Sequence, residues 1–152
     1  INNINDIFWI FILVLIVLFI KIYLAIKRKI NFFRSDIRKV DKMNGHEFEM
    51  YLEHLFKRLG YKAKKTKGSG DYGVDLLLQR DKVTIAVQAE RDKNKENSKA
   101  VQEVVGGKGY YNADEAWVIT NSFFTKSAQE LAHKNGVKLI NRNDLIKIMV
   151  KR

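Results

Sequence analysis

The stretch VDLLLQRDKVTIAVQAE, residues 74–90, decides the fold. It contains two mainly apolar segments, Val74–Gln79 and Val83–Glu90, and the polar residues Arg80–Lys82 separate them. Short apolar segments that are joined by a few polar residues are typical of a β-hairpin. The stretch therefore predicts two antiparallel strands that are joined by a tight turn.

Helix and strand patterns continue on both sides of this hairpin. Before it, Asn44 and Glu47 have the spacing of a capping box at the start of a helix, and Gly60 provides its end. The other expected elements are a strand at Tyr61–Lys67, a helix at Lys99–Tyr111, a strand at Ala116–Thr120, a helix from Thr125 to Asn135, a strand at Val137–Ile140 and a helix at 142–150. This order begins αβββαβ and predicts one α/β domain of about 110 residues.

Four side chains in this region carry oxygen atoms that suit a metal ion. Gln88 and Glu90 lie two residues apart, so they are expected on one face of their strand. Asp75 opens the neighbouring strand, which is expected to bring it beside them. Glu49 lies at the edge of the apolar face of the first helix, from which a carboxylate can lean toward the sheet. Hard oxygen ligands at a strand end suit Mg²⁺, which can activate water for phosphodiester hydrolysis. Spacing alone also allows four separate surface side chains.

The first 26 residues differ from the rest of the chain. Residues 7–26 are apolar except for Lys21, and a helix of this length spans about 30 Å, the thickness of one hydrocarbon core. Trp9 and Tyr23 lie near its ends, where aromatic side chains are common at membrane surfaces. A signal peptide would need a basic segment before the apolar one, and so small a domain could not cover a helix that is apolar all round. We therefore expect one transmembrane helix that contacts the lipid bilayer through residues 7–26.

Basic residues follow the apolar segment and none precedes it. The positive-inside rule then places the C-terminal part in the cytoplasm. We expect a transmembrane anchor at 1–26, a basic juxtamembrane linker at 27–43 and a folded domain at 44–152. The linker is expected to contact anionic lipid or to continue the helix.

The charge of the chain suggests a polyanionic partner. The formal net charge is +11 and there is no cysteine, so disulfides and thiolate metal sites are excluded. A small domain this basic usually meets nucleic acid or an anionic membrane surface. Solubility alone is the alternative explanation of the charge.

Several segments, taken in order, resemble the catalytic domain of Mrr-type restriction endonucleases. They are Gly45–Glu49, Leu59–Tyr61, Gly70–Asp75, Val87–Arg91, Ala113–Ser122 and Phe124–Ala128. These enzymes belong to the PD-(D/E)xK nuclease superfamily, whose αβββαβ core agrees with the element order expected above. The resemblance implies a restriction-endonuclease-like α/β fold with a mixed central sheet, here preceded by one transmembrane helix. It also implies Mg²⁺-dependent cleavage of DNA.

The resemblance also implies roles for individual residues. It assigns the metal-binding aspartate to Asp75, the second acidic-or-glutamine position to Gln88 and the helix glutamate to Glu49. The expected metal ligands are Asp75, Gln88 and Glu90, and Glu49 completes the expected catalytic set.

One position departs from the family pattern. Members usually carry Q-x-K in the third strand, whereas this chain has Glu90 at the lysine position. Three interpretations stay open. Glu90 is an additional metal ligand or base, or Arg91 or Lys93 supplies the cation, or the domain binds DNA without cutting it. Arg91 is expected on the opposite face of the strand, which makes it a poor substitute.

The candidate DNA contacts are expected in loops or directly beside them. They are Lys65, Lys67, Ser69, Arg91, Ser122 and Thr125. For Ser69 a flexible turn is an equal alternative, and for Thr125 ordinary helix capping is the stronger one. The charge, the expected anchor and the family resemblance together predict a single-pass endonuclease of the bacterial cell membrane. It is expected to cleave DNA with Mg²⁺, in defence against foreign DNA. An inactive module that tethers DNA is the alternative, and the sequence leaves a homodimer open.

Overall fold

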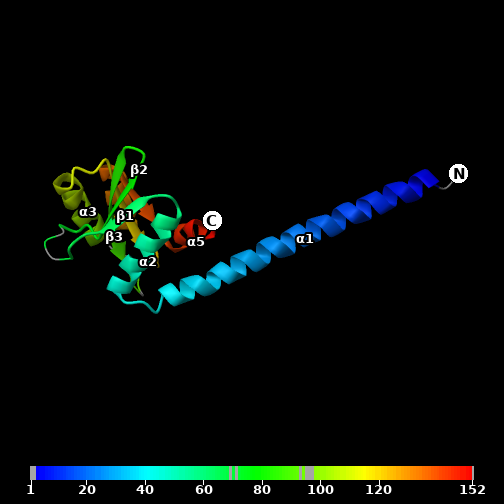
Figure 1. Cartoon of the computed structure of the whole chain (residues 1–152), viewed down its shortest axis with the longest axis horizontal. Helices are drawn as coiled ribbons and strands as arrows, with labels where there is room; N and C mark the ends of the chain where they lie inside the picture. The colour runs from blue at the N-terminus through cyan, green and yellow to red at the C-terminus, as the bar shows by residue number, and fades with distance from the viewer. Residues whose placement is uncertain (1–2, 69, 71, 93, 95–97, 152) are drawn as a thin grey trace.

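The structure is a computed structural model that describes residues 3–68, 70, 72–92, 94 and 98–151, with residues 3–7 and 28–36 described by their backbone alone. A long helix, α1 (Asn3–Val40), extends from a small α/β body (Figure 1). Its C-terminal end reaches that body, and its N-terminal end lies far from it (Figure 1).

The described residues contain a five-stranded sheet in the order β1-β2-β3-β4-β5. Strands β1 (Lys62–Lys65), β2 (Leu76–Arg80) and β3 (Val83–Glu90) are antiparallel neighbours. Strands β4 (Glu115–Thr120) and β5 (Val137–Ile140) continue the sheet in parallel with β3. The expected hairpin and the expected mixed sheet are both confirmed.

Four helices cover the two faces of the sheet. They are α2 (Gly45–Arg58), α3 (Ser98–Tyr110), α4 (Lys126–Asn135) and α5 (Arg142–Val150). One apolar cluster joins α2, α5 and the end of α1 to residues such as Leu76 and Val87. A second cluster joins α3 and α4 to residues such as Ala86 and Val118. The alternation along β3 therefore places Val87 and Ala89 on the α2 face and Gln88 on the α3 face.

The first domain helix begins as the sequence predicted. The Asn44 side chain accepts a hydrogen bond from the Glu47 amide at 2.9 Å, and Glu47 accepts one from the Asn44 amide at 2.7 Å. This capping box satisfies two donors that a helix N-terminus leaves unpaired. It fixes where α2 starts, and so it also fixes the height of Glu49 above the sheet.

The last turn of α1 packs against the folded body. Ile37 and Val40, which lie in the stretch expected to be a linker, are 2% and 0% exposed in the apolar cluster under α2. The helix thus continues through residues 27–36 and ends inside the core. Burial of two aliphatic side chains contributes about 1.5–3 kcal/mol each, so the end of α1 is part of the domain's packing.

One helix of the described residues is long and apolar enough to cross a membrane. It is the segment Phe8–Lys27 of α1, of which none is buried against the rest of the chain. Side chains from Phe8 to Ile26 are largely exposed, including Trp9 at 65%. A soluble core therefore does not account for this apolar surface.

Candidate active site

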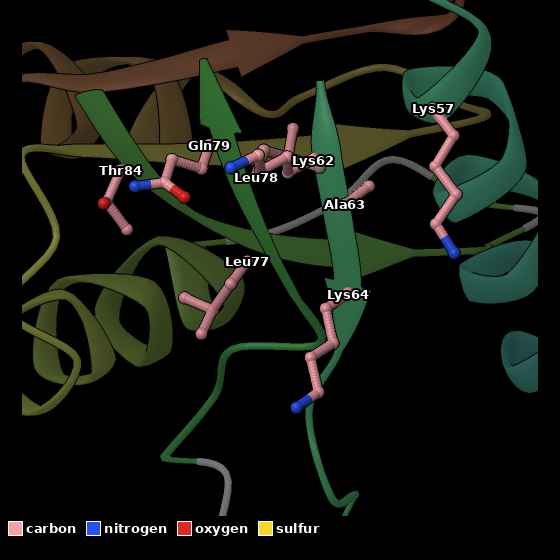
Figure 2. A pocket seen from close by; sticks show the side chains of 8 residues that line it. All are labelled: Lys57, Lys62, Ala63, Lys64, Leu77, Leu78, Gln79 and Thr84. Atoms are coloured by element: carbon pink, nitrogen blue, oxygen red, sulfur yellow. The ribbon is translucent and has the colours of Figure 1, made fainter. Parts of the chain in front are cut away.

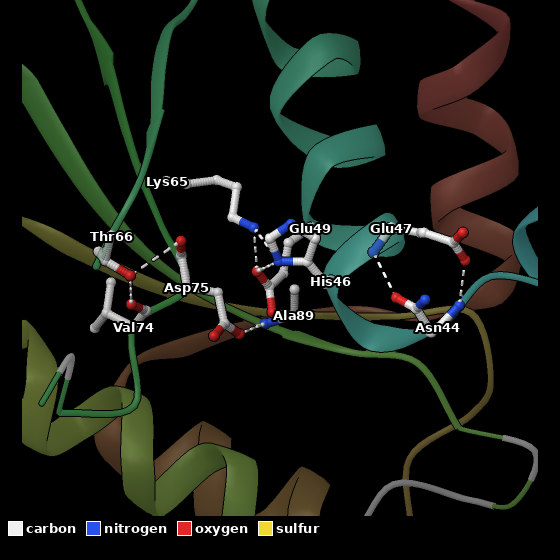
Figure 3. Close-up of polar contacts among 9 residues, drawn as sticks. All are labelled: Asn44, His46, Glu47, Glu49, Lys65, Thr66, Val74, Asp75 and Ala89. Carbon is white, nitrogen blue, oxygen red and sulfur yellow. Dashed lines mark hydrogen bonds and ion pairs between the residues drawn. The ribbon is translucent and has the colours of Figure 1, made fainter. Parts of the chain in front are cut away.

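Asp75 lies where strands β2 and β3 separate. Its amide donates to the Val87 carbonyl at 2.8 Å. Its carboxylate then accepts a hydrogen bond from the Ala89 amide at 2.7 Å (Figure 3). If β2 were longer, a backbone carbonyl of β2 would accept this hydrogen bond instead. Strand β2 consequently begins at Leu76, two residues later than the sequence indicated. Because Ala89 lies between Gln88 and Glu90, the Asp75 carboxylate is fixed beside that pair.

Gln88 and Glu90 lie on one face at the end of β3, as predicted. The Gln88 Nε2 donates to Glu90 Oε1 at 3.0 Å. Gln88 is 8% exposed, and its buried Oε1 has no hydrogen-bond partner among the residues that the structure describes. An unpaired buried amide oxygen costs about 1–3 kcal/mol. The Gln88 oxygen is therefore a hydrogen-bond acceptor or metal ligand that the described residues leave unused.

Glu49 reaches the site from helix α2, where it is held by a lysine from strand β1. Lys65 Nζ lies 2.7 Å from Glu49 Oε2 and 2.9 Å from His46 Nδ1 (Figure 3). The Lys65 and Glu49 side chains are only 19% and 23% exposed. Lys65, expected to contact DNA, thus joins β1 to α2 through an ion pair.

The neighbouring residue Thr66 ties the end of β1 to the start of β2. Its Oγ1 donates to the carbonyls of Val74 at 2.5 Å and Asp75 at 3.2 Å (Figure 3). Its amide donates to the Asp75 carbonyl at 3.0 Å. The backbone of Asp75 is therefore held from both neighbouring strands, which orients its carboxylate without any contribution from a ligand.

The oxygen atoms of Asp75, Gln88 and Glu90 are the candidate ligands of a divalent ion. Among the described residues, no three His, Asp or Glu side chains are gathered closely enough to hold a metal by themselves. Mg²⁺ commonly uses only one or two carboxylates and completes its shell with water and substrate phosphate. Asp75, Glu90 and the unpartnered Gln88 oxygen supply hard oxygen donors of that kind. The residues present therefore fit Mg²⁺, whereas Glu49 is occupied by Lys65.

The remaining candidate DNA contacts are dispersed. Lys67 is exposed beyond the end of β1, and Ser69 lies outside the described residues, as does Lys93. Thr125 caps α4, since its Oγ1 accepts from the Ala128 amide at 3.3 Å. Ser122 accepts a hydrogen bond from the Arg142 amide at 2.8 Å through its carbonyl. Of the described candidates, Lys67 lies near the end of β1, whereas Ser122 and Thr125 lie between β4 and α4, so these three do not form one cluster.

A polar network beside the site was not predicted from the sequence. Arg142 donates to both carboxylate oxygens of Asp41 at 2.6 and 2.8 Å and to the Asn121 carbonyl at 2.8 Å. The buried Asn121 also donates to Asp41 at 2.9 Å and accepts from the Asp92 amide at 2.9 Å. These residues line a cavity of about 400 Å³. No sequence signal relates Asp41 to Arg142, which lies 101 positions later.

This network perturbs the ionisation of its members. The hydrogen bond from Arg142 lowers the pKa of Asp41, against an opposing effect of burial, and Arg91 lowers the same pKa to a smaller degree. The hydrogen bond to Asp41 raises the pKa of Arg142.

The outer edge of the sheet carries a basic hollow of about 530 Å³. Figure 2 shows Lys57, Lys62 and Lys64 around it, with Leu77 and Gln79 of strand β2. Asp75, Gln88 and Glu90 do not line this hollow. It adds positive surface along β1, next to the strand that holds the site.

Residues 40–149 match the family model described as restriction endonuclease, the Mrr catalytic domain. No curated protein matches the chain in sequence. Among solved structures, the chain is similar to the DNA modification-dependent restriction endonuclease AspBHI, with a TM-score of 0.63, 18% identity and coverage of 81% of this chain and 35% of that one. It is also similar to the MspJI restriction endonuclease in complex with a 27-mer oligonucleotide (TM-score 0.56, 19% identity, 77% and 31% coverage).

A third similar structure is that of AF1548, a protein of unknown function, with a TM-score of 0.53, 16% identity and coverage of 62% of this chain and 56% of that one. The chain therefore spans about a third to a little over half of the length of these proteins. At such identities the likeness concerns the fold alone.

Proposed function

This chain belongs to the restriction endonuclease family, and from that premise we propose that it cleaves DNA phosphodiester bonds with Mg²⁺ where strand β2 begins and strand β3 ends. The observation that carries the proposal is the placement of Asp75. Its carboxylate is held at 2.7 Å by the amide between Gln88 and Glu90. This supports a shared role for Asp75 and for the two oxygen-bearing side chains that flank Ala89.

The chain's own residues have distinct proposed tasks. Asp75, Glu90 and the Gln88 oxygen would hold Mg²⁺, which supplies Lewis-acid stabilisation of the phosphate and a more acidic bound water. Glu90 takes the proton of the attacking water, in place of the lysine that is usual at its position. Water adds to phosphorus, one P–O ester bond breaks, and the released alcohol oxygen takes up a proton from solvent water. Lys65 keeps Glu49 in position above the sheet.

A second candidate function rests on Glu90 itself. If a cation is indispensable at that position, the domain binds or tethers DNA without cutting it. Lys65, a cation on strand β1, is paired with Glu49 and so does not replace the missing lysine. We favour the enzyme because Gln88 Oε1 is left unpaired at a buried position, where a purely structural residue would be satisfied.

The test is the nicking of supercoiled plasmid by the full chain in detergent micelles, with Mg²⁺ or with EDTA. Cleavage that requires Mg²⁺ supports the enzyme. No cleavage by the wild type, but cleavage by Glu90→Lys, would show a site that has lost its activity. If neither protein cleaves while salt-sensitive DNA binding persists, the tethering function is the correct one.

The proposal includes an anchor in the bacterial cell membrane, with the nuclease domain in the cytoplasm. It is supported by the exposed apolar segment Phe8–Lys27 and by basic residues that follow it but do not precede it. Protease added to sealed inside-out vesicles is expected to digest residues 44–152, whereas protease outside right-side-out vesicles should leave them intact. The opposite pattern would overturn this orientation. The proposed biological role of this cleavage is defence against foreign DNA.

A further inference from the structure

Two exposed tyrosines stack on each other beside the active site. Tyr72 precedes strand β2 and Tyr110 ends helix α3, and their ring centroids lie 4.1 Å apart with an interplanar angle of 30°. The two residues are 58% and 59% exposed. Tyr111 packs edge-on against Tyr110 at 5.0 Å. Aromatic rings in a solvent-exposed stack offer flat apolar faces that the fold itself does not cover.

The tyrosines adjoin a cavity of about 310 Å³ whose other walls are basic. Tyr110 and Tyr111 line it on the side of α3, and Lys64 and Lys67 line it on the side of β1. Leu77, the cross-strand partner of Lys64, also lines it. The lining therefore combines aromatic faces with ammonium groups, and no acidic residue belongs to the described part of it.

The cavity adjoins the proposed active site through Thr66. Thr66 lines it as well, and the Thr66 amide donates to the carbonyl of Asp75 at 3.0 Å. The cavity thus lies next to the residue that carries the Asp75 carboxylate, which is the reason for considering the same polynucleotide as its ligand.

Two glycines fix the position of Tyr72. A Cβ on Gly107 of helix α3 would lie 2.6 Å from the Tyr72 carbonyl oxygen and would also collide with the Val74 side chain. A Cβ on Gly73, whose φ is +74°, would collide with Glu103. The segment before β2 therefore lies directly on α3. This close packing brings the backbone of Tyr72 against the helix that ends with Tyr110, and the two rings stack without a ligand.

We propose that this cavity binds an unpaired nucleobase of a DNA strand, with Tyr110 and Tyr111 contacting the base and Lys64 and Lys67 contacting the flanking phosphates. The proposal rests on the proposed function, since it deepens the substrate class of the same site. Stacking on aromatic side chains combined with a basic groove is how proteins hold single strands without reading their sequence. A base inside a duplex is stacked on its neighbours, so the site favours single-stranded, flapped or locally opened DNA.

The test compares two DNA probes on the full chain in detergent micelles with EDTA present, so that binding is measured without cleavage. One probe is a fluorescent oligothymidine of about 16 nucleotides, near the upper site size of single-strand binding folds. The other is a blunt duplex of the same length. We expect Tyr110→Leu to weaken oligothymidine binding about fivefold or more, since base–aromatic stacking is worth about 1–3 kcal/mol. Duplex binding should change by less than twofold.

The matched control is Tyr110→Phe, which keeps the ring and should bind oligothymidine like the wild type. Tyr72→Leu provides a second variant from the other half of the stack, and thermal unfolding of each variant checks that the fold is intact. Equal affinity of Tyr110→Leu and wild type for oligothymidine overturns the proposal. An equal loss for both probes also overturns it, because the site would then contact any DNA.

Failure here is distinguishable from failure of the nuclease function. If plasmid nicking with Mg²⁺ is intact while Tyr110→Leu leaves oligothymidine binding unchanged, only the nucleobase cavity is refuted. If oligothymidine binding depends on Tyr110 but no protein nicks plasmid, the cavity is supported and the catalytic proposal is not.

Discussion

The proposed catalytic activity depends on a few individual residues. Gln88 is buried, donates to Glu90 and yet leaves its carbonyl oxygen without a partner in the described chain. The positions of Gln88 and Glu90 on one face were predictable, because strand alternation is a local rule. The pairing of Asp75 with the Ala89 amide was not, because it depends on where β2 separates from β3.

We predict that Gln88→Met weakens Mg²⁺ binding while preserving the volume of the side chain. Loss even of groups that only support metal ligands costs about 10- to 100-fold in affinity, so removal of a direct oxygen donor should raise the dissociation constant by at least tenfold. Titration calorimetry on the full chain measures it. Gln79→Met, an exposed change on strand β2, is the control. Unchanged Mg²⁺ affinity in Gln88→Met would remove Gln88 from the ligand set.

Among the helices and strands, the hairpin and the helix caps could be predicted from the sequence. The close contacts between these elements could not. The capping box at Asn44 was expected and is present. By helix propensity alone, the glycines of α3 would only weaken that helix. One of them, Gly107, is required, because the backbone of Tyr72 lies where its Cβ would be.

Two neighbouring glycines of α3 should therefore respond in opposite ways to alanine. We predict that Gly107→Ala lowers the free energy of unfolding by about 1–3 kcal/mol through overpacking and reduces cleavage by shifting the segment before Asp75. Nothing lies within 4 Å of a Cβ at Gly106, so Gly106→Ala should raise stability by about 0.5–1 kcal/mol. Urea unfolding in detergent micelles measures both. Similar effects of the two substitutions would show that helix propensity alone governs these positions.

At the scale of the whole molecule, α1 is joined to the domain through its last turn. Ile37 and Val40 are buried, and Asp41 is paired with Arg142 on α5. The sequence indicated the apolar segment and the basic residues after it, but it gave no sign that the helix ends in the core. The contacts of Asp41 join residues about a hundred positions apart, which no local pattern encodes.

We predict that Arg142→Gln lowers the free energy of unfolding by about 1–2 kcal/mol at neutral pH, as for a charged hydrogen bond that is partly screened by solvent. Because Arg142 lowers the pKa of Asp41 below its ordinary 3.8, the stabilisation is present above that pH and is lost as pH falls through the folded-state pKa. The difference between wild type and variant should therefore shrink below about pH 4.

The control for this pair is Lys147→Gln, which removes an exposed basic partner of Asp144 on the same helix. It should change stability by less than about 0.5 kcal/mol. A difference between wild type and Arg142→Gln that persists unchanged into acid would show that the loss arises from packing of the arginine and not from its ion pair.

Mg²⁺-dependent nicking of supercoiled plasmid by Asp75→Asn, beside Asp81→Asn in the exposed hairpin turn, tests the central claim most directly. The account predicts that Asp75→Asn loses about 100-fold or more of the wild-type rate, since a metal contributes several kcal/mol to the transition state, while Asp81→Asn cleaves like the wild type. Equal rates for Asp75→Asn and the wild type would contradict it.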